Sequence, residues 1–417
     1  MTNGTESREE FSILILGGDT HYNRGDRAIR AAMLDPIRAW APAARIYIVS
    51  RDAARDEAEW GVRVIARSIP ALLRRTTFLH GLRLVLWGGG HLLQDDSSKV
   101  KNVYWATVLH ALRHRTRCPL IGYGLGVGPV TTAWGCFFAA RAVAQLDAFA
   151  ARDETSAQLV RQWSRGRLPV RVLPDPAVCF RPADRAAARA ALEQGQGVPL
   201  KEDEIRIGIG LRRWFHIRRR LVPLQWRYRL TAGRCPPTPP LFERFSDNLA
   251  GALNRFAAER AVRFLFFPMY VAPWEADDAE SRALALKLKA PSHVLDLDVP
   301  APLMKGMTGF CHLFIGVRLH SAILALGMNV PTLGLAYVRK GNDLFERIGL
   351  RDQALDISDA AGADGEDRLL EKLTGLYEHR DAVRAAQSKA WAPLESECRA
   401  GYSEFLREAL ARRRRND

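Results

Sequence analysis

The sequence predicts an α/β fold in which two Rossmann-like domains face each other across a cleft. Short apolar segments alternate with helical segments along most of the chain, and they lack the strict polar alternation of half-exposed strands. Such segments are typical of parallel strands that are covered on both faces. The 417 residues also exceed a single ordinary hydrophobic core.

The segment Leu173-Pro-Asp-Pro-Ala177 interrupts this alternation. We therefore expect a first domain over residues 1–180, which would face the acceptor, and a second over residues 181–380, which would face the donor. A C-terminal helix and basic tail should follow over residues 381–417.

Strands of the first domain are expected near Ile13, Ile46, Val64, Val85, Ile121 and Phe149. Glycine-rich loops follow three of them, at residues 17–26, at Gly88-Gly89-Gly90 and at residues 124–128; after the first loop we expect a helix over residues 27–34. Glycine permits positive φ and close backbone approach, and a helix N-terminus offers free N–H groups. The loops match neither a dinucleotide-binding fingerprint nor a P-loop, but together they predict a crevice lined for a polar ligand.

The second domain should contain strands at residues 205–211, 263–268, 294–297, 312–316 and 332–336. Helices are expected over residues 241–258 and 279–289, and the crossover between the domains over residues 181–204. Residues 380–414 read as a helix that packs back across both domains.

The strand at residues 312–316 leads into Arg318 and His320, just before a helix expected over residues 321–326. Ligands of open α/β sheets bind at the carboxyl ends of the strands. Arginine supplies a planar positive charge there, and histidine exchanges protons near neutral pH. The pattern indicates an anion site beside a proton carrier; the alternative is a surface arginine and a helix-capping histidine.

Composition favours a folded, cytoplasmic protein. Apolar residues make up 47% and charged residues 26%, and the start of the chain lacks the pattern of a signal peptide. No apolar run reaches the length of a membrane-spanning helix. The six cysteines lack C-x-x-C spacing and the pairs Asp95-Asp96 and Asp277-Asp278 do not form a cage, so we expect no metal.

The net charge of +15 raises the question of an anionic partner. No nucleic-acid-binding motif is present, so we expect no nucleic acid. The segment from Arg213 to Arg229 mixes arginine with tryptophan and tyrosine, which suits an acceptor loop or peripheral contact with the inner face of a membrane. The arginines of the C-terminal tail are expected to be exposed to solvent.

Short motifs spread between about residues 12 and 350 resemble the polysaccharide pyruvyl transferase family. They are Asn23-Arg-Gly-Asp26 with Ala28-Ile29, Gly88-Gly-Gly90 with Leu92-Leu-Gln-Asp95, Gly124-Leu-Gly-Val-Gly-Pro129, Ala151-Arg-Asp-Glu154, Asp175-Pro176, Leu211-Arg212, and Arg318-Leu-His320 with Gly334 and Lys340. Arg27 and His91 depart from the family pattern, which bears on recognition of the acceptor.

The resemblance implies a GT-B arrangement and a reaction that joins pyruvate to a sugar as a cyclic ketal. Phosphoenolpyruvate is the implied donor and co-substrate, with no further cofactor. The implied acceptor is a sugar of a cell-surface polysaccharide or of its lipid-linked precursor. The donor carries a carboxylate and a phosphate, so several cations should bind it.

We assign the acid/base role to His320 and the donor's anionic groups to Arg212, Arg318, Lys340 and, from the first domain, Arg152. Asp95 could orient the acceptor hydroxyl or act as a base, or it could cap a helix expected from Lys99. Asn23, Asp26 and the three glycines Gly88, Gly89 and Gly90 are assigned to the acceptor side or to loop geometry.

Two other functions stay open on the sequence. The first is a GT-B glycosyltransferase that uses a nucleotide-sugar, although the strand ends of the second domain offer no clear carboxylate for a ribose apart from Asp343 and Glu346 on a helix. The second is a basic, non-enzymatic binding protein, for which binding should fall gradually as many arginines are replaced.

Overall fold

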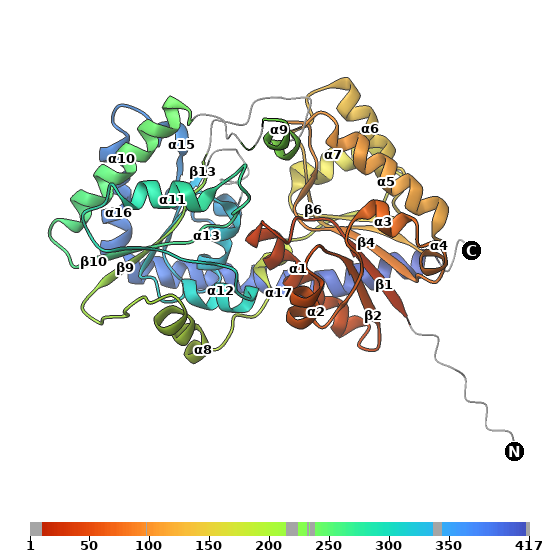
Figure 1. The fold of residues 1–417 in the computed structure, drawn as a ribbon, viewed down its shortest axis with the longest axis horizontal. Helices are drawn as coiled ribbons and strands as arrows, with labels where there is room; N and C mark the ends of the chain where they lie inside the picture. Colours follow the sequence, from red (N-terminus) through yellow and green to blue (C-terminus); the bar gives the residue numbers. More distant parts are fainter. Residues whose placement is uncertain are drawn as a thin grey trace, which may run out of the picture.

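The computed structural model describes residues 11–96, 98–213, 224–231, 233, 238–336 and 344–413. Two parallel sheets, each flanked by helices, form two domains that lie side by side (Figure 1). This confirms the predicted fold class.

The first sheet has the order β3-β2-β1-β4-β6-β7-β8, with the short β5 paired to β6. Its strands are β1 (Ser12–Leu16), β2 (Arg45–Val49), β3 (Arg63–Ala66), β4 (Leu84–Gly88), β5 (His91–Leu93), β6 (Leu120–Val127), β7 (Ala148–Ala151) and β8 (Val170–Val172).

The second sheet has the order β11-β10-β9-β12-β13-β14. Its strands are β9 (Ile205–Gly210), β10 (Val262–Phe266), β11 (Ser292–Val294), β12 (Leu313–Gly316), β13 (Thr332–Ala336) and β14 (Ala354–Asp356). In both sheets the strand order reverses beside the first strand, and ligands of such sheets bind at this switch point. The loops after β1, β4, β9 and β12 therefore occupy the binding positions of the two domains.

Four strands differ from expectation. β11 ends at Val294, where a strand was expected to begin, and the short β5, β8 and β14 were not predicted. Each of these four strands has only three residues, which leaves little pattern in the sequence.

The helices of the first domain are α1 (Arg24–Trp40), α2 (Ala53–Trp60), α3 (Ile69–Leu73), α4 (Thr76–His80), α5 (Lys101–Arg115), α6 (Ala133–Val143) and α7 (Glu154–Ser164). The 3₁₀ turn η1 (Pro176–Val178) follows, and the second domain contains α8 (Arg185–Ala190), α9 (Leu224–Leu230), α10 (Pro240–Ala257), α11 (Asp277–Ala285), α12 (Ala301–Thr308), α13 (Leu319–Leu326), α15 (Ile357–Ala360) and α16 (Gly365–Glu378). The C-terminal helix is α17 (Arg380–Arg413).

Helix α1 begins three residues earlier than expected because Asn23 caps it. The Asn23 side chain accepts hydrogen bonds from the backbone N–H groups of Gly25 and Asp26, which satisfies donors that the first turn leaves unpaired. Asp26 therefore lies in the first turn of the helix. Helix α13 likewise begins at Leu319, so His320 is a helical residue.

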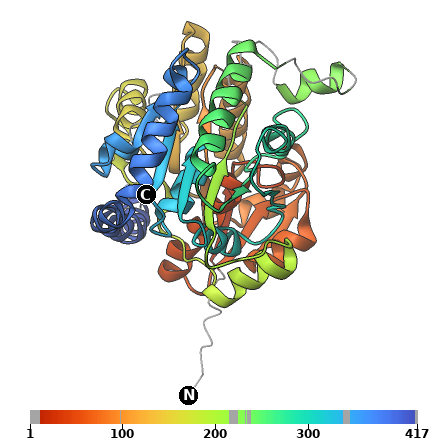
Figure 2. The same ribbon diagram turned by 90° about the vertical axis from the view of Figure 1, so that its left-hand side faces the viewer.

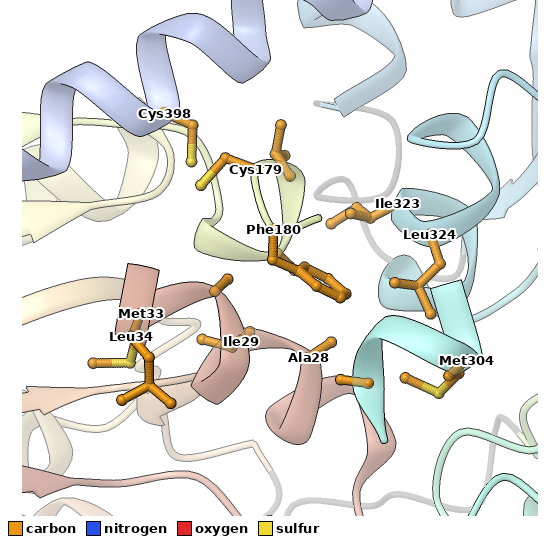
Figure 3. Packing of buried hydrophobic residues seen from close by; sticks show 14 of the residues in the cluster. Ala28, Ile29, Met33, Leu34, Cys179, Phe180, Met304, Ile323, Leu324 and Cys398 are labelled. Atoms are coloured by element: carbon orange, nitrogen blue, oxygen red, sulfur yellow. The ribbon is translucent and has the colours of Figure 1, made fainter. Parts of the chain in front are cut away.

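The two domains share one apolar core at their junction. Figure 3 shows Ala28 and Ile29 of α1 packed near Phe180 of the linker, with Met304 of α12 and Ile323 of α13 on the other side. Residues from both sheets belong to this cluster. The junction is thus built like a domain interior.

Helix α17 packs against both domains, running beneath them in Figure 1 and seen nearly along its axis in Figure 2. Near its start, Gln387 donates hydrogen bonds to the carbonyl oxygens of Leu326 and Val330 in the second domain, both at 3.2 Å. Near its end, Tyr402 stacks on Tyr123 of β6 with ring centroids 4.4 Å apart.

Candidate active site

The loop after β1 pairs directly with the loop after β10. The backbone N–H of Arg24 donates to the carbonyl of Met269 at 2.7 Å, and that of Val271 donates to the carbonyl of Tyr22 at 3.1 Å. The Tyr270 hydroxyl donates to Asp19 Oδ2 at 3.0 Å. These contacts bring the N-terminus of α1 to the carboxyl edge of the second sheet.

His320 projects from the first turn of α13 onto the first turn of α1. A Cβ atom built on Gly25 would lie 2.5 Å from His320 Nδ1, so only glycine leaves room for the imidazole. His320 Nε2 lies 3.6 Å from Asp175 Oδ2, which is an ion-pair distance and too long for a hydrogen bond. Within the described residues this buried nitrogen has no hydrogen-bond partner. It is therefore placed to exchange a proton with a ligand or water.

Asp175 connects His320 to Arg152 of the first domain. Arg152 Nη1 donates to Asp175 Oδ2 at 2.8 Å, and the backbone N–H of Ala177 donates to Oδ1 at 3.0 Å. Burial alone would raise the pKa of the Asp175 carboxyl, but His320 and Arg152 outweigh it and hold this pKa below its ordinary value. Asp175 is thus a fixed carboxylate between His320 and Arg152.

Asp26 is a second candidate proton carrier at this site. Its Oδ2 accepts a hydrogen bond of 2.6 Å from the backbone N–H of Asp19. Burial raises the pKa of Asp26, opposed in part by that hydrogen bond and by the charges of His320 and Lys101. Asp26 therefore interacts electrostatically with both His320 and Lys101.

Lys101, in the first turn of α5, was not among the predicted site residues. Its Nζ donates to the carbonyl of His91 at 2.6 Å. Burial lowers its pKa from 10.5 to about 8, although Asp96 and Asp26 act in the opposite direction. The imidazole of His91 lies beside the Arg152 guanidinium, since a Cβ on Gly126 would be 2.5 Å from His91 Nε2 and 2.6 Å from Arg152 Nε.

The Arg318 guanidinium is paired with two carboxylates of the protein itself. Its Nε donates to Asp277 Oδ2 at 2.5 Å, and Nη2 donates to Asp277 Oδ1 at 2.7 Å and to Glu275 Oε2 at 3.0 Å. Between these two carboxylates Ala276 has a φ of 49°, a left-handed conformation that alanine rarely adopts. Arg318 therefore holds a strained loop, and its assignment to the donor stays a prediction.

Arg212 approaches the same loop, with Nη2 3.9 Å from Glu275 Oε2. Burial raises the pKa of Asp277 to about 6, although Arg318 lowers it. The structure thus brings Arg212 and Arg318 together, as expected for residues at the ends of neighbouring strands β9 and β12.

Asp95 holds the start of α6 and does not cap the helix that follows it. Its carboxylate accepts hydrogen bonds from the backbone N–H groups of Thr131 and Thr132 at 2.9 and 3.0 Å, and from both hydroxyls at 3.1 and 2.5 Å. The helix expected from Lys99 begins at Lys101. Burial alone would raise the Asp95 pKa, but these hydrogen bonds lower it, so Asp95 is poorly suited to carry a proton.

The three glycines Gly88, Gly89 and Gly90, the first of which ends β4, allow backbone geometry that a side chain would hinder. A Cβ on Gly88 would lie 2.3 Å from the carbonyl oxygen of Tyr123, so this position requires glycine for sheet packing. Gly89 and Gly90 have φ values of +88° and +86°. A Cβ on Gly90 would also lie 3.0 Å from Asp26 Oδ1, so this loop packs closely against the Asp26 carboxylate.

Two predictions fall partly or wholly outside the described residues. Lys340 lies outside them, as does most of the segment from Arg213 to Arg229. Inside the described ranges, Arg213 Nη1 pairs with Glu280 at 3.2 Å, and α9 exposes 58% of Trp226.

Within the part of the chain that the structure describes, no group of three or more histidine, cysteine or acidic residues is placed to hold a metal. Nor does any helix there have the length and apolar character needed to span a bilayer.

The fold and site define a two-domain α/β protein of the GT-B type, with candidate proton carriers and cations where the switch points of the two sheets meet. The chain belongs to the polysaccharide pyruvyl transferase family, whose profile matches residues 23–338. The family supports a transferase acting on polysaccharide.

A known protein shares a short stretch of sequence with this chain. The amylovoran biosynthesis protein AmsJ of Erwinia amylovora is 29% identical over 80 residues, which are 19% of this chain and 18% of that protein. The chain thus matches less than a fifth of the length of this relative.

Solved structures share the fold over nearly the whole chain. UDP-GlcNAc 2-epimerase from Neisseria meningitidis has a TM-score of 0.60 at 11% identity, covering 96% of this chain and 100% of that chain. Trehalose 6-phosphate synthase from Burkholderia multivorans has a TM-score of 0.55 at 13% identity, covering 96% and 99%. At such identities the similarity establishes the GT-B-like fold alone.

Proposed function

We propose that this protein transfers pyruvate from phosphoenolpyruvate to two hydroxyls of a sugar, forming a cyclic ketal and releasing phosphate. The observation that carries the proposal is the convergence of His320, from the second domain, on the Asp175–Arg152 pair of the first. This convergence lies within the residues that match the family.

The reaction requires two proton transfers. One sugar hydroxyl attacks C2 of the enol while C3 gains a proton and becomes a methyl group. The second hydroxyl then replaces phosphate at C2, and its proton leaves with the phosphate. Both protons come from the sugar and neither is consumed by the protein, so two side chains that accept and return protons would be sufficient.

We assign these two roles to His320 and Asp26. His320 Nε2 is buried without a hydrogen-bond partner among the described residues, and the Asp175 carboxylate lies 3.6 Å away. Asp26 has a raised pKa and lies within the electrostatic influence of His320. A carboxyl group with a raised pKa is suited to proton transfer near neutral pH.

We assign the donor's carboxylate and phosphate to Arg152 and Arg212, with Lys101 adding a positive charge near Asp26. Arg318 would support Arg212 by holding Glu275 in place. Lys340 remains a candidate from the second domain. Since these cations can neutralise the donor, activity should survive EDTA.

The test is a comparison of ligands by thermal unfolding. Phosphoenolpyruvate should raise the melting temperature at millimolar concentration, and UDP should not. Arg152→Gln should lose this stabilisation, whereas Arg161→Gln, on an exposed helix surface, should keep it. Stabilisation by UDP alone would instead favour a nucleotide-sugar glycosyltransferase, and phosphate release with candidate glycans would then be absent.

A further inference from the structure

Helix α6 exposes an aromatic surface that the transferase site does not use. Trp134 and Phe137 are 55% and 57% exposed, and Phe138 is partly buried against the core. Together with Arg141 they have the spacing i, i+3, i+4 and i+7, which places them on one side of the helix. We call these four residues the α6 stripe.

The stripe is an ordered surface. The rings of Trp134 and Phe138 lie 4.6 Å apart between centroids, and the Arg141 guanidinium lies 5.7 Å from the centroid of Phe137. Exposed aromatic side chains gathered on one face usually mark an interaction site. A row of tryptophan and phenylalanine that ends in arginine suits an interface that is apolar on one side and anionic on the other.

The charge around the stripe has one sign over a long stretch of chain. Between residues 97 and 146 the sequence contains no aspartate or glutamate, whereas it contains Lys99, Lys101, Arg113, Arg115, Arg117 and Arg141. Lys99 and Arg113 are engaged in ion pairs with Asp95 and Asp147, and Arg115 and Arg141 are exposed.

Helix α16 of the second domain provides the contrast. It carries Glu366, Asp367, Glu371 and Glu378 against only Arg368 and Lys372. The α5/α6 stretch of the first domain is therefore more favourable to an anionic surface than α16 is.

We propose that the α6 stripe is a membrane-docking surface that inserts into the headgroup region of an anionic phospholipid bilayer. Trp134 and Phe137 enter the interface, and the surrounding basic residues select acidic headgroups. The contact is peripheral, since no described helix spans a membrane.

The stripe also has a fixed position relative to the active site. Asp95 follows β5, whose His91 lies beside Arg152, and the same Asp95 carboxylate binds the backbone of Thr131 and Thr132 at the start of α6. A bilayer at the stripe would therefore lie close to the acceptor side of the site. Presentation of a lipid-linked sugar from that bilayer rests on the proposed function, but the docking itself does not.

The test is flotation of the full chain with phosphatidylcholine vesicles that contain or lack phosphatidylglycerol, without any substrate. The wild type should bind only the anionic vesicles, and added salt should weaken binding. The double variant Trp134→Ser, Phe137→Ser should bind about tenfold more weakly or worse. Leu286→Ser is the matched control, because Leu286 is 88% exposed on the second domain and its loss should not change binding.

A second measurement reports contact directly. Lipids brominated in the upper acyl chain should quench part of the wild-type tryptophan fluorescence, and Trp134→Phe should remove that part. Unchanged melting temperatures would show that the variants fold. Equal vesicle binding by the wild type and the double variant would overturn the proposal. It would also be overturned if the wild type bound no vesicles but sedimented as a dimer, and the double variant sedimented as a monomer.

Discussion

At the scale of single residues, His320 and Asp175 form the contact on which the proposed chemistry depends. The imidazole is confined by Gly25 on one side and by the Asp175 carboxylate on the other. These two neighbours hold the imidazole in one orientation, which is the requirement that the proposed proton transfer places on it.

His320→Ala should lower turnover by about 10²–10⁴ while leaving the affinity for phosphoenolpyruvate nearly unchanged. Single-turnover rates and calorimetric titration measure the two quantities separately. His114→Ala, on the exposed face of α5, is the control. Loss of donor affinity in His320→Ala, with normal rates at saturating donor, would make His320 a donor ligand.

Lys101 predicts a dependence of stability on pH. Its pKa in the folded protein is about 8, below the ordinary 10.5. Between these values the unfolded chain binds a proton that the folded protein lacks, so the free energy of unfolding should rise with pH across this window. Lys101→Met should remove the rise in urea unfolding, and Lys389→Met, at an exposed position of α17, should not. If the free energy of unfolding rises with pH as steeply in Lys101→Met as in the wild type, the pKa of Lys101 in the folded protein has its ordinary value.

The site was only partly predictable from sequence, and the reason differs between residues. His320, Arg318 and Arg212 follow strands, so the pattern of apolar segments placed them at one sheet edge. Lys101 and Tyr270 gave no such signal, because their proximity to the site depends on side-chain burial and on pairing between loops of different domains. Asp175 stood out only through the family resemblance. The two parallel sheets confirm the α/β fold class that the alternation of strand and helix segments predicted.

At the scale of elements, the loop from Met269 to Asp277 joins the two halves of the site. Its backbone pairs with the loop before α1, and its acidic end is held by Arg318. Breaking a buried ion pair by removing one partner leaves the other charge uncompensated.

Arg318→Ala should therefore reduce the free energy of unfolding by about 3–5 kcal/mol, and Arg318→Lys should restore part of it. Chemical denaturation measures both. A variant with Arg318→Ala that unfolds like the wild type but no longer binds phosphoenolpyruvate would instead support the donor role expected from the sequence.

The loop between β5 and α5 is an element anchored by Asp95. Asp95→Ala should cost about 1–3 kcal/mol because it leaves buried N–H and hydroxyl groups without an acceptor. Asp184→Ala should cost less, since Asp184 caps α8 through a single bond to Ala187 at 2.9 Å. Thermal unfolding of both variants tests the comparison. Normal stability with lost turnover in Asp95→Ala would return Asp95 to the catalytic residues.

At the scale of the whole molecule, the continuous core and α17 should make the two domains unfold together. Leu406 of α17 is fully buried in the shared cluster. Leu406→Ala should destabilise the protein by about 2–5 kcal/mol, and Leu286→Ala, at an 88% exposed position, should have almost no effect. Scanning calorimetry should show one transition in the wild type. Two well-separated transitions, unchanged by Leu406→Ala, would mean that the domains are thermodynamically independent.

The position of α17 in the chain has a consequence for how the protein is made. Chains emerge from the ribosome with the N-terminus first, and domains fold as they appear. Both sheets can form before α17 is available, but the surface that receives Tyr402 and Leu406 then remains open to solvent. The nascent protein is therefore expected to pass through a stage in which both domains have formed but the surface that α17 covers is still exposed. A stop codon that removes only this last helix should yield an aggregation-prone product, although it leaves every proposed active-site residue in place.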